Sequence, residues 1–145
     1  MARSIGGTDG LVVGYMGPSH SAANEFQLNI GGPGWDVILR SRSKYSPGTW
    51  YHVAATKNGD NYRLYVNGGL KDEATIAGVS AVYQSREIAL GRWNWGASPS
   101  YTNGMIDEVA IYKRALSSAE IFGIYFADTY GKCAAGMSNA DLDGD

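Results

Sequence analysis

The sequence predicts an all-β domain of two packed antiparallel sheets, followed by one short C-terminal helix. Glycine supplies 20 of the 145 residues, about twice the usual ~7%. Ten tyrosines and four tryptophans favour strands over helices, because aromatic side chains fit a pleated surface. Short apolar segments alternate with turn residues along the chain, and one helix start lies near its end. These observations indicate strands joined by tight turns.

The first part of the chain predicts three strands. Residues 11–15 are apolar, and residues 17–21 form a loop. Residues 26–30 alternate apolar and polar side chains, which is the pattern of a half-buried strand. The glycines and proline of residues 31–34 end that strand, and residues 35–41 form the next.

The middle of the chain predicts a hairpin. Residues 50–57 and 62–67 flank Asn58 and Gly59, a pair typical of tight hairpin turns. Residues 67–69, Asn-Gly-Gly, form a second turn.

A weaker strand and a connection are expected from this second turn to residue 84, and residues 87–92 return the chain to the sheet. Residues 92–104 show no regular pattern, so we expect a loop there.

Residues 105–112 predict a strand that is apolar on both faces, as in the interior of a sandwich. Asp107 is then expected among apolar neighbours, where it needs a partner. The helix follows at once, because Ser117 and Glu120 have the spacing of a capping box. We expect the helix to dock through Ile121, Ile124 and Tyr125.

Four segments resemble the laminin-G-like domains of the concanavalin A-like lectin/glucanase superfamily. They are W-Y-H-V-A at residues 50–54, Y-R-L-Y-V-N-G at 62–68, E-I-A-L-G-R at 87–92 and G-M-I-D-E-V-A-I-Y-K-R-A-L-S-S-A-E-I at 104–121. Their order and spacing match the family pattern over about 75 residues. The resemblance implies a two-sheet antiparallel jelly-roll sandwich over residues 1–130, and it implies more about architecture than about ligand.

Composition limits the classes of partner that this chain can bind. Charged residues make up 18% of the chain and the net charge is −2, so no basic field attracts nucleic acid. The apolar runs are too short to span a membrane, and residues 1–4 lack the apolar core of a signal peptide. The resemblance implies an extracellular or cell-surface location within a larger exported protein, with export encoded elsewhere.

Both ends of the chain depart from the family pattern. The family begins with a strand before the segment equivalent to residues 11–15, and that strand is missing here. We therefore expect the first residues to rearrange, or two chains to form a homodimer through the truncated sheet edge.

At the other end, residues 131–145 are a Gly/Asp-rich tail or linker. There Asp141, Asp143 and Asp145 resemble the start of a dockerin or EF-hand calcium loop. The alternative is a solvated acidic tail.

Asp107 is the stronger calcium candidate. The resemblance implies a structural Ca²⁺ site in which this aspartate joins backbone carbonyls, since hard oxygen ligands suit that cation. The alternative is that Asp107 or Glu108 pairs with Arg92 or Arg114, or accepts backbone N–H groups.

Aromatic and amide residues in two loops predict a carbohydrate-binding site. Aromatic faces stack on sugar C–H groups, while amides and carboxylates bind hydroxyls. The alternatives are a protein-binding or adhesive surface, or aromatics that only close the end of the sandwich. The candidate ligand residues are Trp35, Asp36, Trp93, Asn94, Trp95, Tyr101 and Asn103.

Catalysis is the least favoured function. Cys133 is the only cysteine and His20 and His52 the only histidines, so a nucleophilic thiol lacks an evident partner base. No motif places two carboxylates across a glycosidic bond, and adjacent acids on a strand point to opposite faces. A glycoside hydrolase fragment remains the second alternative. The acids considered are Glu25, Asp36, Asp60, Asp72, Glu73, Glu87, Asp107 and Glu108.

Overall fold

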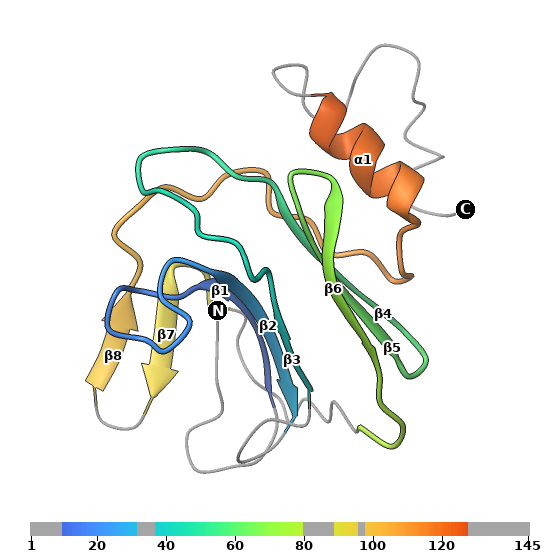
Figure 1. Ribbon diagram of the computed structural model, residues 1–145, viewed down its shortest axis with the longest axis horizontal. Helices are drawn as coiled ribbons and strands as arrows, with labels where there is room; N and C mark the ends of the chain where they lie inside the picture. Colours follow the sequence, from blue (N-terminus) through green and yellow to red (C-terminus); the bar gives the residue numbers. More distant parts are fainter. Residues whose placement is uncertain (1–9, 32–36, 80–88, 96–97, 128–145) are drawn as a thin grey trace.

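The computed structural model describes residues 10–31, 37–79, 89–95 and 98–127. These residues form eight strands and one helix (Figure 1). The elements are β1 (Gly10–Tyr15), β2 (Phe26–Gly31), β3 (Val37–Arg40), β4 (Val53–Asn58), β5 (Asn61–Val66), β6 (Gly69–Thr75), β7 (Arg92–Trp95), β8 (Ser98–Tyr101) and α1 (Ser118–Phe126).

The first three strands form an antiparallel sheet in the order β1-β2-β3. Residues Leu28 and Ile30 of β2 lie opposite Leu39 and Val37 of β3, so their apolar side chains share one face. The alternation read from residues 26–30 therefore predicted this apolar face. It did not predict the other face, because Gln27 and Asn29 are buried as well, so β2 is covered on both faces and is not half-buried.

The next three strands form a second antiparallel sheet in the order β4-β5-β6. Its first hairpin turns between Asn58 and Asn61, as the Asn-Gly pair predicted, and Gly59 has φ +56 there. Its second hairpin turns at Asn67 and Gly68, which have φ of 51° and 72°. Positive φ at both central residues is the geometry of a type I′ turn, and Asn-Gly suits it.

The apolar faces of the two sheets meet and form the core. The central cluster contains Leu28, Ile30, Val37, Leu39, Tyr62 and Leu64. The sheets also touch at their edges, where the backbone N–H of Arg40 in β3 donates to Asp72 Oδ2 in β6 at 3.0 Å. The fold is thus the all-β, two-sheet antiparallel sandwich with one short helix that the sequence predicted.

Helix α1 begins as predicted. The Ser117 hydroxyl accepts from the Glu120 N–H, and the Glu120 carboxylate accepts from the Ser117 N–H at 2.7 Å, which completes the capping box. Ile121 is buried, Ile124 is half-buried and Tyr125 lies beside Gly68. The helix therefore docks against the β5–β6 turn.

Residues 105–112 are the main correction to the expected fold. They form no strand, and Met105, Ile106, Val109 and Ile111 are exposed. Glu108 has φ +49, which interrupts an extended backbone, and its N–H donates to Asp107 Oδ1 at 2.8 Å. A side chain that satisfies the local backbone competes with sheet formation, so the apolar alternation alone was not enough to form a strand.

Three boundaries also differ from expectation. The strand expected at residues 50–57 begins only at Val53. Residues 89–91 of the expected strand 87–92 are not in a strand, and β7 begins at Arg92. The loop expected at residues 92–104 contains the β7–β8 ribbon instead, because Trp93-Asn94-Trp95 pairs with a second short extended segment.

Candidate functional site

The β7–β8 ribbon brings together most of the predicted ligand residues. Its register pairs Arg92 with Tyr101, Trp93 with Ser100 and Trp95 with Ser98. The predicted residues carried by the ribbon are Trp93, Asn94, Trp95 and Tyr101. Four residues that sequence reasoning assigned to a loop therefore have their backbones in one two-stranded element. Sites built on strands are positioned more precisely than sites on irregular loops.

The open end of this ribbon is exposed. The side chain of Tyr101 is 72% exposed, and Asn103, two residues further on, is exposed as well. The N–H of Thr102 donates to the Gly91 carbonyl at 2.8 Å, which extends the pairing one step beyond the strands. Trp35 and Asp36, the remaining candidates, lie outside the described residues. The ribbon thus presents an aromatic and an amide side chain to solvent at one end.

A second aromatic group was not predicted as a site. Rings of Tyr15, Phe26, Tyr45 and Tyr51 pack on one another with centroid distances of 5.0 to 5.7 Å. The Tyr15 hydroxyl lies 2.8 Å from the Tyr45 carbonyl and 3.0 Å from Asn24 Oδ1, both of which accept hydrogen bonds. These hydroxyl contacts join the end of β1 to two loops, so the group stabilises this end of the sandwich.

Trp50 lies three residues before the start of β4 at Val53, and it is 60% exposed. Sequence reasoning counted it as part of the W-Y-H-V-A strand, because it begins that motif. Nothing in the sequence indicates that Trp50 would be exposed, because the motif continues without a break into the strand; the structure shows that β4 begins only at Val53.

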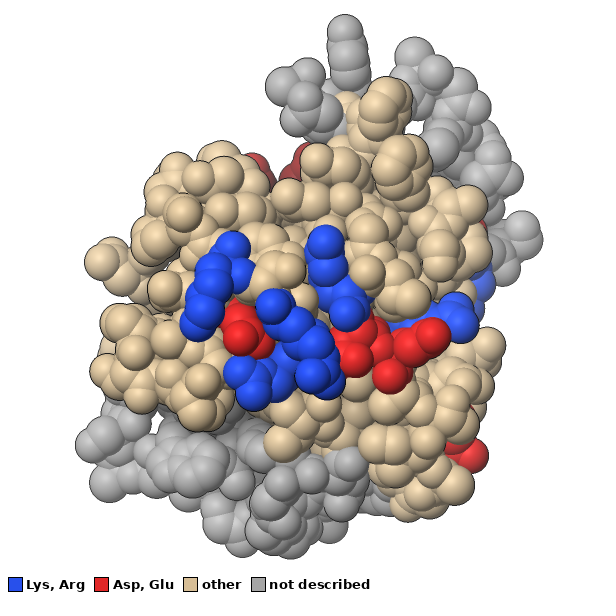
Figure 2. Space-filling model, viewed as in Figure 1, with Lys and Arg blue, Asp and Glu red and all other residues tan. Residues whose placement is uncertain are grey.

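Acidic and basic side chains gather in a band across one face of the molecule (Figure 2). The strands and loops of this region carry the ion pairs Arg40–Glu25 at 3.1 Å, Arg42–Asp72 at 3.3 Å and Arg63–Glu73 at 2.9 Å. Because both signs alternate along the band, it has no strong field of one sign.

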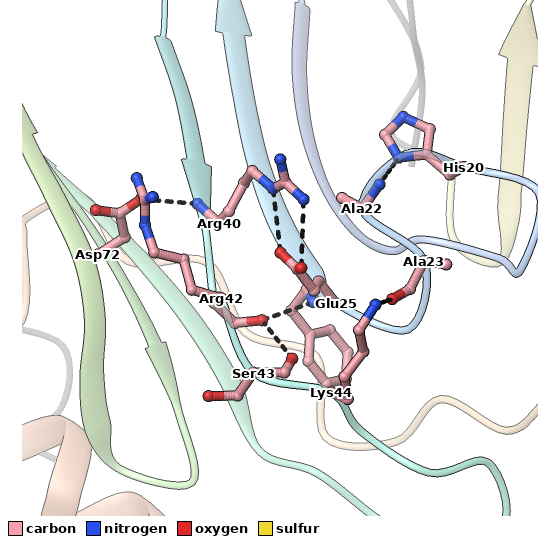
Figure 3. A network of polar contacts seen from close by, with 11 residues as sticks. His20, Ala22, Ala23, Glu25, Arg40, Arg42, Ser43, Lys44 and Asp72 are labelled. Atoms are coloured by element: carbon pink, nitrogen blue, oxygen red, sulfur yellow. Dashed lines mark hydrogen bonds and ion pairs between the residues drawn. The ribbon is translucent and has the colours of Figure 1, made fainter.

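Glu25 is the most buried carboxylate of this band. It binds the Arg40 guanidinium through two hydrogen bonds of 3.1 and 3.3 Å (Figure 3). Nearby, the Lys44 ammonium donates to the Ala23 carbonyl at 2.7 Å. His20 is exposed, and its Nδ1 accepts from the Ala22 N–H at 3.0 Å, which is a loop-stabilising role. Each of these groups is engaged within the protein itself.

The adjacent acids that were considered as a catalytic pair bind different arginines. Asp72 and Glu73 are adjacent, yet they bind Arg42 and Arg63 respectively. This agrees with the alternation of side chains along a strand. Asp36, Glu87 and Cys133 lie outside the described residues.

The calcium candidate Asp107 is exposed, which corrects the expectation that it lies among buried apolar neighbours. In the described structure residues 105–112 belong to none of the three sheets, so they are not enclosed as a strand inside the sandwich would be. Arg114, one expected partner, binds Glu120 at 2.7 Å. In the described ranges, no group of three or more His, Cys, Asp or Glu side chains is arranged to hold a metal ion. Asp141, Asp143 and Asp145 lie outside these ranges.

The start of the helix carries a strong electrostatic effect. Hydrogen bonds from the Arg114 guanidinium, and then from Ser117, lower the pKa of the Glu120 carboxyl to about 2.

Within the part of the chain that the structure describes, no helix is long and apolar enough to cross a membrane.

Comparison with known proteins agrees with this architecture. The family model described as the concanavalin A-like lectin/glucanases superfamily, a laminin G family, matches residues 3–122. Comparison with curated protein sequences gave no match.

One solved structure with a similar fold is an S-layer domain-containing protein (residues 221–444) from Clostridium thermocellum ATCC 27405. The TM-score is 0.52 and the identity 24% over 80% of this chain. The matched region spans 63% of that structure. From the family match over most of its length, the chain belongs to the laminin-G-like domains of the concanavalin A-like lectin/glucanase superfamily.

Proposed function

We propose that this chain is a non-catalytic carbohydrate-binding module of an exported protein, acting outside the cell or at its surface. The observation that carries the proposal is the pairing of β7 with β8, which gathers Trp93, Asn94, Trp95 and Tyr101 on one ribbon. Members of this superfamily form surface or binding modules, and this proposal names the ligand class.

The chemistry of the ribbon suits a sugar. Pyranose rings offer C–H faces that stack on aromatic rings, and their hydroxyls bind amides. Tyr101 and Asn103 are both exposed and only two residues apart. Neither residue carries charge, which favours a neutral glycan over an anionic one.

The state of the carboxylates supports a non-catalytic role. Glycosidases need two carboxyl groups that face one bond, whereas Glu25, Asp72 and Glu73 each bind a different arginine. Hydrolysis of a polysaccharide by this chain, lost on a single acidic substitution, would instead favour the glycosidase alternative.

We also propose that calcium, where bound, has a structural role through Asp107. Its carboxylate lies in an exposed segment and has one oxygen, Oδ1, engaged by the Glu108 N–H. Oxygen ligands from a carboxylate and nearby carbonyls suit this cation.

Binding to polysaccharides tests the main proposal. The protein is run in native gels that contain soluble glucan, xylan, mannan or pectin, and it is sedimented with insoluble cellulose and chitin. We expect retention by at least one neutral polysaccharide. For that polysaccharide, Tyr101→Ala should weaken binding several-fold, since loss of one stacking contact removes on the order of 0.5–1.5 kcal/mol.

Phe126→Ala is the matched control, because Phe126 is an equally exposed aromatic on the helix, at 74% exposure. It should leave retention unchanged. Failure of every polysaccharide to retain the protein would contradict the proposal. Equal weakening by the control would show that retention reflects general aromatic adhesion.

A protein partner is the second candidate function. The observation that favours it is the exposed apolar segment at residues 105–111, because such segments mark protein interfaces.

A further inference from the structure

Three Asn–Gly pairs occur in the chain, at residues 58–59, 67–68 and 103–104. Such a pair can lose ammonia without a catalyst, because the glycine nitrogen reaches the carbonyl carbon of the asparagine side chain with no Cβ in its way. In the sequence the three pairs are equivalent, since each asparagine is followed by the same residue. Their surroundings in the structure make them different.

The pair at residues 67–68 is held most firmly. The Asn67 N–H donates to the His52 carbonyl at 2.8 Å, and Asn67 Oδ1 accepts from the His52 N–H at 3.1 Å. Gly68 is buried beside Phe122 of α1. Cyclisation requires rotation of both the backbone and the side chain of Asn67. These two hydrogen bonds would therefore have to break before Asn67 could react.

The pair at residues 58–59 is held by its backbone alone. Asn58 is the last residue of β4 and pairs with Asn61, and the Lys57 ammonium donates to the Gly59 carbonyl at 2.7 Å. The Asn58 side chain is exposed and has no hydrogen-bond partner among the described residues. The hairpin therefore resists the backbone rotation that cyclisation needs, whereas nothing holds the carboxamide.

The pair at residues 103–104 has neither restraint. Asn103 and Gly104 are exposed and lie outside every strand and helix. Within the described ranges, neither the Asn103 carboxamide nor the Gly104 N–H has a hydrogen-bond partner. The attacking nitrogen and the carbon that it attacks are therefore both free, and both are open to water.

We propose that Asn103 is a site of spontaneous deamidation in the folded protein and that it reacts before Asn58 and Asn67. The Gly104 nitrogen attacks Asn103 Cγ, so that the N–Cγ bond forms and the Cγ–Nδ2 bond breaks. The amide proton of Gly104 leaves with Nδ2 as ammonia. Water then adds to either carbonyl of the resulting succinimide and opens the ring. The product is aspartate, or isoaspartate, in which the backbone runs through the side-chain carbon.

Deamidation changes the candidate glycan site, and this step rests on the proposed function. A carboxamide both donates and accepts hydrogen bonds, whereas a carboxylate only accepts them. Conversion of Asn103 therefore removes the N–H donors two residues after Tyr101 and adds a negative charge to the site. The converted chain binds a neutral polysaccharide more weakly, so the module loses affinity as it ages.

Peptide mapping of the folded chain, aged in mildly alkaline buffer, tests the site of reaction. Trypsin cuts after lysine and arginine and so places the three asparagines in separate peptides, residues 58–63, 64–71 and 93–113. Mass spectrometry measures conversion in each peptide, and fragmentation of the third separates Asn103 from Asn94. We expect Asn103 to convert at least roughly tenfold faster than Asn67, because local opening must precede reaction at Asn67. Asn58 should lie between them.

The same chain aged in guanidinium chloride is the control for the fold. Unfolding removes every restraint, so the three asparagines should convert at similar rates. A folded chain in which Asn103 converts no faster than Asn58 or Asn67 would overturn the proposal. So would a ranking that is unchanged in denaturant, because the sequence and not the fold would then select the site.

Gly104→Ala is the matched variant for the binding step. A Cβ at residue 104 would meet Thr102 Cγ2 at 3.7 Å, which is ordinary contact, and φ there lies outside the left-handed region. Alanine therefore fits, yet its side chain hinders the attack on Asn103. Fresh Gly104→Ala should bind the retaining polysaccharide as the unchanged chain does and should keep that affinity on ageing.

The aged unchanged chain should lose affinity several-fold, since an amide donor is replaced by a charge that no group compensates. Equal loss in aged Gly104→Ala would contradict the link to Asn103. So would a fully converted chain that binds as the fresh chain does. If no polysaccharide retains even the fresh chain, the proposed function fails alone, because the ranking of the three peptides involves no ligand.

Discussion

Glu120 shows how one side chain holds the start of a helix. Its carboxylate accepts from the Ser117 N–H and from two nitrogens of Arg114, at distances of 2.7 to 3.1 Å. These groups favour the charged form, so the pKa of Glu120 falls to about 2 from its ordinary value of 4.5. The helix start is thereby tied to the ionisation of a single carboxyl.

This lowered pKa makes stability depend on pH. A carboxyl whose pKa is lower in the folded state contributes its full stabilisation above about pH 4.5, and that contribution is lost as the pH falls toward 2. We expect Glu120→Gln to be less stable than the unchanged chain at pH 7. The difference in unfolding free energy should shrink steadily between pH 4.5 and pH 2.

Urea unfolding at several pH values measures this difference. Glutamine keeps an oxygen that can accept from the Ser117 N–H, so the comparison isolates the charge. A difference that stays constant from pH 7 to pH 2 would show that the carboxylate charge contributes nothing to the helix start.

Buried hydroxyls illustrate what the residue scale leaves to tertiary structure. Tyr62 and Tyr65 are both fully buried on β5. The Tyr65 hydroxyl bonds Ser118 Oγ at 3.1 Å, whereas the Tyr62 hydroxyl has no hydrogen-bond partner in the described structure. The sequence shows two tyrosines of one strand, and the docking of α1 makes them different.

At the scale of elements, the contact between α1 and the β5–β6 turn depends on Gly68. A Cβ at Gly68 would lie 3.0 Å from Tyr125 Cδ1 and 3.3 Å from the Phe122 backbone. The close approach of helix to turn therefore requires a residue without a side chain.

We expect Gly68→Ala to destabilise the protein by about 2–4 kcal/mol. About 1–2 kcal/mol comes from the left-handed backbone, and a further ~1–2 kcal/mol comes from the crowding against α1. Gly59→Ala is the matched control. Gly59 also has positive φ, at 56°, but open space surrounds it.

Chemical denaturation of both variants measures the two contributions. Gly59→Ala should lose only the backbone part, about 1–2 kcal/mol. Equal losses in the two variants would mean that the helix does not press on the turn.

Residues 105–112 show that a pattern alone does not make an element. Their alternation is typical of a strand, yet they form no strand in the structure; residues 105–111 are exposed and Tyr112 is half-buried. A strand exists only where a neighbour accepts its hydrogen bonds, and sequence alternation cannot supply that neighbour. The candidate ligand residues show the opposite case. Their short segments have no evident strand pattern, yet they pair with each other and form the β7–β8 ribbon.

At the scale of the whole molecule, bound calcium would act on global stability. If Asp107 holds calcium, excess calcium should raise the melting temperature of the unchanged chain but not that of Asp107→Asn. At a calcium concentration of about 100 times the dissociation constant, the gain is ~2.7 kcal/mol. In chelator the two proteins should melt together.

Calorimetric scans in calcium and in chelator measure both states. Asparagine keeps an acceptor for the Glu108 N–H, so the local turn is preserved. Asp60→Asn serves as the control and should respond to calcium as the unchanged chain does. A calcium response of equal size in Asp107→Asn would remove Asp107 from the site.

The sequence by itself determined the features that depend on neighbours along the chain. The Asn-Gly turns, the capping box of Ser117 and Glu120 and the alternation in β2 follow from local backbone preferences and side-chain period, and the structure has all three. Four motifs in order were enough to identify the family.

Only the tertiary structure decided which segments are paired and which side chains are exposed. It left residues 105–111, Asp107 among them, in solvent, began β4 only at Val53, left Trp50 exposed before it, and built the β7–β8 ribbon. The physical reason is that strand pairing and burial are satisfied between segments distant in sequence. No single segment contains the information about its partner.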